Sequence, residues 1–467
     1  MSQKYIIYIL AFYFLFTVNL SAQNTWERTY GGSSFDEGRA VLQTNDGGYI
    51  VIGWTNSYGA GDYDIYLVKT DNFGDTLWTK TYGTSEDERA SCIIQTSDGG
   101  YILSGFSLLT NDSLGDIYFI KLTSQGDTVW SRKYDGANER RGYLIESTQD
   151  GGFIISGSTY SYGASNLDIL LMKTDSLGDS VWTRTYGGSG KEEGFAFQTS
   201  DSGYIISGYT TSFGDSLGDV YLVKTDPSGN PIWTKTFGGD STDEGYAIPT
   251  DDGGYLIFAY TLSYGAGGGD IYLIKTDNQG DTIWSKTYGG SNMDRGSAIP
   301  VSDGGYIIAG STSSYGAGSM DVYLIKTDPS GNPLWTKTYG DTGVDYATVI
   351  QQTSDNGYII SGTTNSFGAG GYDIYLIKTN SSGHVATEET FTFPNNFNTD
   401  FFIESNPFIY FTTIPGYENV FFEVKDILGR PVGIYKGEKI GEDLLPGIYF
   451  ISLYNTAIPG TRIIKIR

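Results

Sequence analysis

Acidic side chains recur at one position in this chain, and carboxylates can hold hard cations or hydroxyl-rich ligands. Ten residues after each of seven regularly spaced tryptophans, six positions are acidic and one is arginine. These positions are Asp36, Glu88, Arg140, Glu192, Asp243, Asp294 and Asp345. The carboxylates could form a ligand-binding ring. They could equally hydrogen-bond backbone amides in turns, and a residue repeated in every unit favours that structural role.

Aromatic residues form a second repeated set in a loop further along each unit. Six of seven units carry one, and the second unit has Thr110 instead. The set is Tyr58, Tyr162, Phe213, Tyr264, Tyr315 and Phe367. Aromatic faces can stack on sugar rings, but they can also fill the gaps between repeated units.

Three arginines interrupt the repeat in two adjacent units. Arg89, Arg140 and Arg141 could together grip a carboxylate or sulfate, since guanidinium groups bind such anions bidentately. A sialidase-like enzyme would also need a tyrosine nucleophile with a glutamate partner, and Tyr143 is compatible with that role. The structural alternative is a solvated charge cluster that balances an acidic rim.

Composition excludes several other classes of site. The chain has 467 residues, of which 54 are acidic and 29 basic, so the net charge is −25. This charge argues against nucleic-acid binding, which needs clustered Lys and Arg. The single cysteine, Cys92, and the single histidine, His384, exclude a disulfide framework, a thiolate zinc cage and a multi-histidine metal site. No cofactor is predicted; calcium could bind, but nothing indicates it specifically.

The N-terminus predicts a secretory signal over residues 1–22. Lys4 provides a positive start, the apolar run Tyr5–Phe16 is too short to span a bilayer, and Ser21 and Ala22 suit cleavage. No other stretch has transmembrane length, so the mature chain is expected to lack a transmembrane segment.

A repeat of 51 or 52 residues positions all of these groups. It is marked by Trp26, Trp78, Trp130, Trp182, Trp233, Trp284 and Trp335. The first unit has four runs of strand length, each bounded by turn signals: Gly38–Thr44, Tyr49–Thr55, Asp64–Thr70 and Thr76–Tyr82. Seven units of four strands predict an all-β, seven-bladed β-propeller over residues 23–385.

Two segments could complete the last blade. The repeat begins with its Trp strand, Thr25–Tyr30, and ends after a third strand, which favours closure by the N-terminal strand. The alternative is a separate fourth strand at Val385–Thr390. In every unit a lysine also follows an aspartate by five residues, as in Asp64 and Lys69. A lysine on an apolar strand needs a partner, so we expect interblade ion pairs or hydrogen bonds to loop carbonyls.

After a linker at 386–397, residues 398–467 alternate apolar strands with Gly, Pro and Asn turns, which predicts a small Ig-like antiparallel β-sandwich. The ordered motifs N-P-F, D-I-L-G-R, G-I-Y and a Lys-ended strand resemble the type A C-terminal sorting domain of the type IX secretion system. The residues that carry the resemblance are Asn406, Pro407, Phe408, Asp426, Gly429, Arg430, Gly447, Tyr449 and Lys465. Ser405 stands where that family usually has proline, and the chain ends in Arg467.

The repeats resemble the secreted beta-propeller repeat family, through Gly31-Gly32 to Ala40, Gly53-Trp54-Thr55 and Asp64 to Asp71. That resemblance implies a propeller but no specific activity. The sorting resemblance implies export by type IX machinery through the periplasm to the surface of a Gram-negative cell or beyond. Together they predict a non-enzymatic module for adhesion, polysaccharide or protein binding, or rigid spacing. A glycan-active enzyme is the alternative.

Overall fold

The structure is a computed structural model of the chain. It describes residues 25–108, 115–134, 144–160, 166–214 and 217–385, and four later strands within residues 421–466. The predicted signal segment and linker lie outside the described residues. The chain divides into two compact units, Met1–Glu389 and Thr390–Arg467. Nowhere in the described ranges is there a helix long and apolar enough to cross a membrane.

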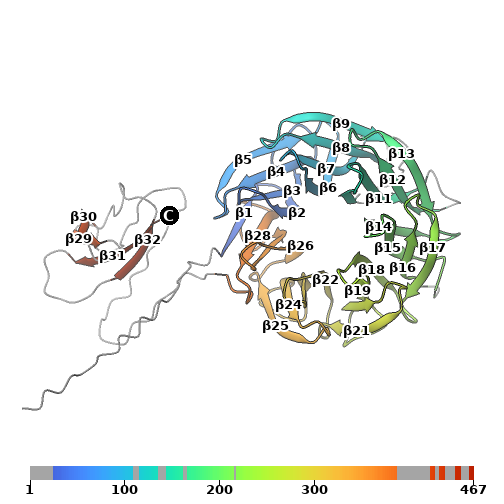
Figure 1. Ribbon diagram of the computed structural model, residues 1–467. Helices are drawn as coiled ribbons and strands as arrows, with labels where there is room; N and C mark the ends of the chain where they lie inside the picture. The colour runs from blue at the N-terminus through green and yellow to red at the C-terminus, as the bar shows by residue number, and fades with distance from the viewer. Residues whose placement is uncertain are drawn as a thin grey trace, which may run out of the picture. The chain divides into compact units, whose positions relative to one another are not determined.

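The first unit is a ring of seven antiparallel four-stranded sheets, which confirms the predicted seven-bladed propeller (Figure 1). We number the blades in chain order from β2. The innermost strands are β2 (Asp36–Gln43), β6 (Asp87–Gln95), β10 (Leu144–Ser147), β14 (Glu192–Gln198), β18 (Asp243–Pro249), β22 (Asp294–Pro300) and β26 (Asp345–Gln352). The second strands are β3 (Tyr49–Thr55), β7 (Tyr101–Leu108), β11 (Phe153–Thr159), β15 (Tyr204–Thr210), β19 (Tyr255–Thr261), β23 (Tyr306–Thr312) and β27 (Tyr358–Thr364).

The third strands are β4 (Asp64–Thr70), β8 (Gly115–Leu122), β12 (Asp168–Thr174), β16 (Asp219–Thr225), β20 (Asp270–Thr276), β24 (Asp321–Thr327) and β28 (Asp373–Thr379). The outer strands are β5 (Thr76–Tyr82), β9 (Thr128–Tyr134), β13 (Ser180–Tyr186), β17 (Pro231–Phe237), β21 (Thr282–Tyr288), β25 (Pro333–Tyr339) and β1 (Trp26–Tyr30). Every residue of β3 and β4 is buried, whereas β5 has a largely exposed face. The middle strands are buried because they have sheet neighbours on both sides and a blade on each face.

The hydrophobic core lies between blades. One cluster joins Ile52 and Leu67 of blade one to Leu103 and Ile120 of blade two. The ring is thus held by a series of such interfaces rather than by one central core, as expected of repeated units that bury their faces on each other.

The Trp of each outer strand contacts a turn of the next blade, and so does the Tyr that ends every outer strand except β17, where Phe237 takes its place. Trp26 Nε1 donates a hydrogen bond to the Asn72 carbonyl (3.1 Å), and the Tyr30 hydroxyl donates to the Gly74 carbonyl (2.6 Å). Gly74 has φ +79°, and a Cβ there would lie 2.9 Å from the Trp26 ring. This contact explains why the x-x-G-D-T turn recurs in phase with the tryptophan.

Each buried lysine pairs within its own blade. Lys69 Nζ lies 3.0 Å from Asp46 Oδ2, in the turn between β2 and β3, and donates to the Thr70 carbonyl (2.9 Å). The expected carbonyl contact is therefore present, but the expected interblade ion pair is wrong. Asp64 lies at the other end of β4, where it accepts hydrogen bonds from the amides of Ala60 and Gly61 (2.8 and 2.9 Å).

The N-terminal strand closes the ring. β1 pairs antiparallel with β28 of blade seven, from Trp26 opposite Lys378 to Tyr30 opposite Ile374. Hydrophobic side chains from blades seven and one then form a shared cluster. The prediction that the first strand completes the last blade is confirmed.

In the second unit the structure describes one antiparallel four-stranded sheet, in the order β30-β29-β31-β32. Its strands are β29 (Phe421–Lys425), β30 (Pro431–Lys436), β31 (Gly447–Leu453) and β32 (Arg462–Ile466). The rest of the predicted Ig-like sandwich lies outside the described residues. The same is true of Asn406, Pro407, Phe408, Asp426, Gly429 and Arg430.

Candidate functional site

The repeated acidic residues head the inner strands and are fully buried. Asp294 Oδ2 accepts hydrogen bonds from the Gly290 amide (2.8 Å) and the Ser314 hydroxyl (2.7 Å), and the Thr312 hydroxyl donates to Oδ1. Asp36, Glu88, Glu192, Asp243 and Asp345 likewise accept hydrogen bonds from backbone amides, and each is 0% exposed. Their direct role in this structure is to hold the loops at the end of the propeller where the inner strands begin. We call this end the rim.

The aromatic set lies beside these carboxylates. Ser57 donates to Asp36 Oδ2 (2.7 Å), and the hydroxyl of its neighbour Tyr58 donates to the Gly31 carbonyl (2.8 Å). Tyr264 and Tyr315 make the same contact with the loop that enters their blade. Tyr162 lies outside the described residues.

The aromatic rings are about half exposed. Tyr315 is 46% exposed, and its ring centroid lies 5.5 Å from that of Tyr323 in β24. Tyr58 with Tyr66, Phe213 with Tyr221, Tyr264 with Tyr272 and Phe367 with Tyr375 form equivalent pairs. One part of each of these loop aromatic side chains therefore packs on its own blade, and the other part remains open to solvent.

One of these pairs borders a cavity of about 430 Å³, which we call the rim groove. Tyr315, Tyr323, Thr336, Lys337 and Thr338 line it. Thr336 and Thr338 are exposed on β25, so their hydroxyls are available to a ligand. Stacking by an aromatic ring together with hydrogen bonds from hydroxyls is the chemistry that a sugar ring requires.

A second, irregular cluster lies at the start of the inner strands of blades one, two and seven. Arg39 lies 4.3 Å and Arg89 5.3 Å from the centre of the Trp54 ring. Arg39 also pairs with Glu37 (3.2 Å), and the Glu37 carboxyl is hydrogen-bonded to Tyr346 of blade seven. Burial raises the pKa of Glu37 and raises that of Tyr346 to about 12.

Of this cluster, only Arg89 was a predicted site residue. Arg89 is engaged by Asp87 through two hydrogen bonds of 2.9 Å and stacks on Tyr63 at 4.2 Å. Arg140 and Arg141 lie outside the described residues. The signal that could have revealed the cluster was departure from the repeat, because Arg39 and Trp54 occur at those positions in blade one alone.

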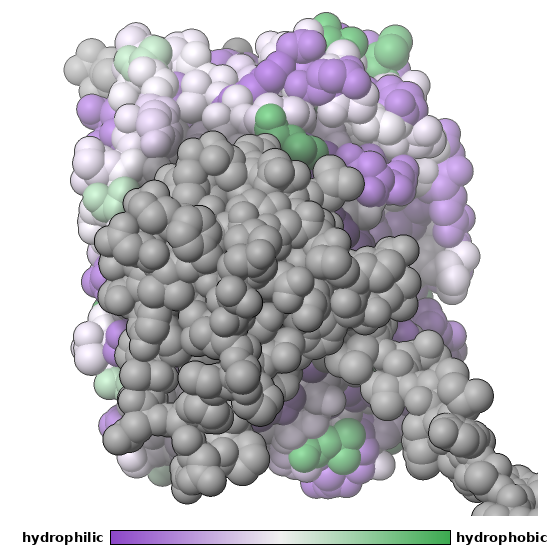
Figure 2. Space-filling model, turned by 90° about the vertical axis from the view of Figure 1, so that its left-hand side faces the viewer, coloured by the Kyte–Doolittle hydropathy of each residue, from purple (hydrophilic) through white to green (hydrophobic). Residues whose placement is uncertain are grey.

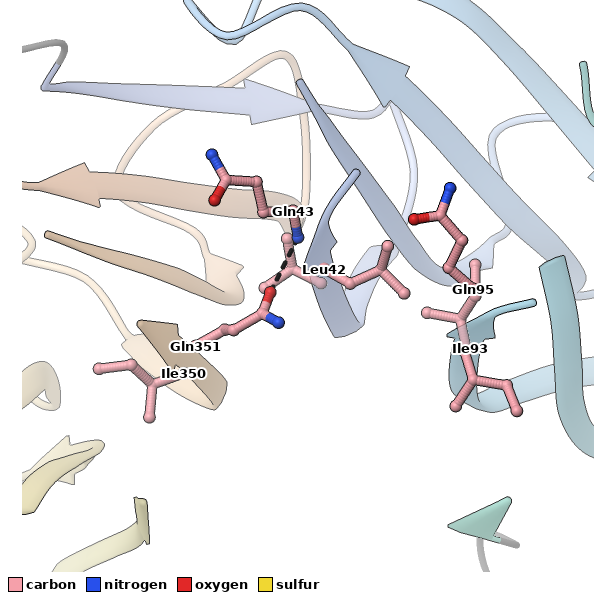
Figure 3. A pocket seen from close by; sticks show the side chains of 8 residues that line it. Leu42, Gln43, Ile93, Gln95, Ile350 and Gln351 are labelled. Carbon is pink, nitrogen blue, oxygen red and sulfur yellow. Dashed lines mark hydrogen bonds between the residues drawn. The ribbon is translucent and has the colours of Figure 1, made fainter. Parts of the chain in front are cut away.

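A cavity of about 380 Å³ lies at the other end of the inner strands. Val41, Leu42, Gln43 and their counterparts on β6 and β26 line it (Figure 3). The Gln351 side chain accepts a hydrogen bond from the Gln43 amide (2.8 Å). With aliphatic walls and no charged lining residue, this cavity has no group that could perform acid–base chemistry.

Metal ligation has little support in the described residues. Within them, no group of three or more His, Cys, Asp or Glu side chains is placed to hold a metal ion. Figure 2 shows one side of the molecule, on which the visible hydrophobic residues stand in small separate groups among hydrophilic ones. Large apolar ligands are therefore poorly matched to this visible surface.

No protein-family model matches this sequence, and no curated protein matches it. Several solved structures are similar in fold. The Pan2 WD40 domain of Neurospora crassa is 9% identical, with a TM-score of 0.45, over 73% of this chain and 89% of that one. A puromycin hydrolase is 12% identical, with a TM-score of 0.49, over 76% of this chain and 54% of that one. The propeller domain of the Trilobed protease of Pyrococcus furiosus is 10% identical, with a TM-score of 0.44, over 74% of this chain and 94% of that one.

These likenesses establish neither a family nor an activity, so the resemblances to the secreted repeat family and the sorting domain remain predictions. One expectation has to be corrected. The expectation that the chain is not an enzyme is contradicted: the solved structures similar to it in fold include a puromycin hydrolase and the propeller domain of a protease. The β-propeller fold gives no ground for excluding catalysis.

Proposed function

We propose that the propeller binds extracellular polysaccharide at its rim, with the aromatic loops as the primary contacts. The observation that carries this proposal is the rim groove, where the half-exposed ring of Tyr315 lies near the exposed hydroxyls of Thr336 and Thr338. An exposed ring offers a face for stacking, and the flanking hydroxyls can exchange hydrogen bonds with sugar hydroxyls.

Repetition supports multivalent rather than tight single-site binding. The same aromatic pair occurs in blades one, four, five, six and seven. Weak contacts on several blades would add through avidity along one polymer. The net charge of −25 favours neutral glycans over polyanions, because like charges repel at long range.

Location is part of this proposal. The predicted signal and the motifs that resemble a sorting domain support export through the periplasm by type IX secretion machinery. Residues 398–467 would direct the propeller to the outer surface of a Gram-negative cell or release it beyond. At either location the propeller could bind an extracellular polysaccharide or protein.

The test is the double variant Tyr264→Ala/Tyr315→Ala. Loss of two stacking faces is expected to reduce retention on a binding polysaccharide severalfold in affinity electrophoresis or on a glycan array. The Tyr264→Phe/Tyr315→Phe variant is the matched control. It removes the hydroxyl contacts to Gly238 and Gly289 but keeps the rings, so its retention should stay near wild type.

Two results would contradict the rim proposal. If the alanine variant unfolds while the phenylalanine variant is stable, the rings serve packing on their own blades. If the wild-type protein is retained by no glycan, with or without calcium, protein binding or a spacer role becomes the leading account.

The Glu37–Tyr346 pair favours a second candidate, a glycan-active enzyme. A tyrosine hydrogen-bonded to a glutamate, with Arg39 and Arg89 nearby, supplies the residue types of a sialidase-like site. A tyrosine nucleophile needs a base, which the Glu37 carboxylate could provide, and the arginines could hold an anionic sugar.

Hydrolysis of a fluorogenic sialoside tests this candidate. Activity that falls to background in Tyr346→Phe, with wild-type melting, would establish it. A matched variant, Tyr209→Phe, changes a tyrosine outside this cluster and should keep full activity. Absence of turnover in the wild-type protein would remove sialosides as substrates and leave the binding proposal untouched.

A further inference from the structure

Pairs of carboxyl groups face each other at the blade junctions. The first member heads a third strand, and the second heads the inner strand of the next blade. The pairs are Asp64 with Glu88, Asp168 with Glu192, Asp219 with Asp243, Asp270 with Asp294, Asp321 with Asp345 and Asp373 with Asp36. All twelve side chains are at most 3% exposed. Like charges at such close quarters in a dry site are costly unless a positive charge lies between them.

A glycine marks the meeting point of each pair. A Cβ added at Gly289 would lie 2.0 Å from Asp270 Oδ1 and 2.7 Å from Asp294 Oδ2. At Gly31 the corresponding distances are 2.2 Å to Asp373 Oδ1 and 2.7 Å to Asp36 Oδ2. The two carboxyl oxygens therefore flank the same small space, and only glycine leaves room for both.

The two carboxyls of the Asp270–Asp294 pair have unlike hydrogen-bond partners. Asp294 accepts three hydrogen bonds, divided between both of its oxygens, which suits an ionised carboxylate. Asp270 Oδ2 accepts from the Ala266 amide (2.7 Å), whereas its Oδ1 is buried and accepts no hydrogen bond. One accepting oxygen and one bare oxygen is the pattern of a carboxylic acid, whose bare oxygen carries the proton.

We propose that the Asp270–Asp294 junction binds a proton, held on Asp270 Oδ1, which faces the Asp294 carboxyl across the position of Gly289. No ion pair within the described residues reaches Asp270 or Asp294. The phenol near Asp294 is Tyr323 of β24, whose pKa is raised to about 12, so it stays neutral.

Electrostatics support the geometry. Burial raises the pKa of Asp270 and of Asp373, and the facing charges of Asp294 and Asp36 raise them further. The sequence offers a natural counterpart, since one blade has Arg140, a permanent cation, at the acidic position. A carboxyl whose pKa is raised by folding stabilises the fold at low pH and loses that contribution as pH rises through the folded-state pKa.

The junctions therefore make the ring sensitive to alkali at this rim. At the opposite end of the blades the pKa shifts have the opposite sign. There, hydrogen bonds and the nearby lysines lower the pKa of the aspartates in the turns between the inner and second strands, with Asp150 and Asp252 at about 2. Those groups lose their contribution as pH falls, so the two ends respond to pH in opposite directions.

The test is the melting temperature of the full chain between pH about 5 and about 9 in wild type, Asp270→Asn and Asp294→Asn. Asp270→Asn places an N–H where the proton is proposed. It should melt as wild type at the acidic end and a few degrees higher at the alkaline end. Asp294→Asn removes an anion that accepts three hydrogen bonds, and it should melt lower at every pH.

If Asp270→Asn also melts lower at every pH, Asp270 is ionised and the proposal fails. It fails as well if chelation lowers, and calcium restores, the alkaline melting temperature of the wild type, because a cation would then occupy the junction. Should the variants not fold, infrared spectra of the wild type decide. A protonated-carboxyl band that disappears on alkalinisation supports the proton, and its absence at all pH values overturns it.

Discussion

A chain that begins at residue 32 is expected to lose the cooperative unfolding of the propeller that a chain beginning at residue 24 retains. The eight residues removed include all of β1, which supplies the fourth strand of blade seven. Trp26 and Tyr30, at 2% and 9% exposure, would be lost from the cluster that joins blades seven and one. Truncating one large buried aromatic commonly costs about 3–5 kcal/mol.

The loss of unfolding free energy should exceed that figure because the β28 edge is exposed at the same time. An unpaired edge strand can pair with another chain, so aggregation should accompany the fall in melting temperature. Differential scanning calorimetry and size-exclusion chromatography of the two matched chains measure both effects. An unchanged melting temperature in the shorter chain would mean that β1 contributes nothing to ring closure.

Removal of residues 398–467 is expected to leave the propeller folded but held in the periplasm. All strands of the ring lie before residue 386, so they are retained in this variant. The motifs that resemble a sorting domain would be absent, and the export machinery would have nothing to recognise. Immunoblots of the periplasm and the culture medium, with circular dichroism of the trapped protein, measure location and folding separately.

The matched control is the truncated chain with residues 398–467 restored by fusion, which should regain export. Normal amounts of the truncated protein outside the cell would show that these residues are not the sorting signal. Misfolding of the truncated protein would instead point to a stabilising role for the second unit.

Local spacing was sufficient to predict the strands. In blade one, the predicted runs Tyr49–Thr55, Asp64–Thr70 and Thr76–Tyr82 coincide with β3, β4 and β5. The inner strand was predicted from Gly38 but begins at Asp36, whose amide bonds to the Tyr372 carbonyl of blade seven (2.7 Å). Turn residues and strand-forming residues are read locally, whereas that extension depends on a partner far along the chain.

The sequence did not determine which strands and side chains pair with partners distant along the chain. The choice between two closing strands became definite only with the register of β1 on β28. For the buried lysines the sequence left two alternatives, interblade ion pairs or loop carbonyls, because strand alternation identifies a buried lysine but not which turn its ammonium reaches. Asp46 is the partner of Lys69 because β3 and β4 run antiparallel and bring the β2–β3 turn beside the end of β4.

The sequence by itself determined the number of blades, their strands and the need to satisfy a repeated aspartate and lysine. Only the tertiary structure decided which carboxyls meet at a junction and that Glu37 reaches Tyr346 from the opposite end of the repeat region. The physical reason is that backbone preference and hydrophobic alternation act over a few residues. Ring closure instead sets contacts between residues more than 300 positions apart, such as the hydrogen bond from the Gln43 amide to Gln351.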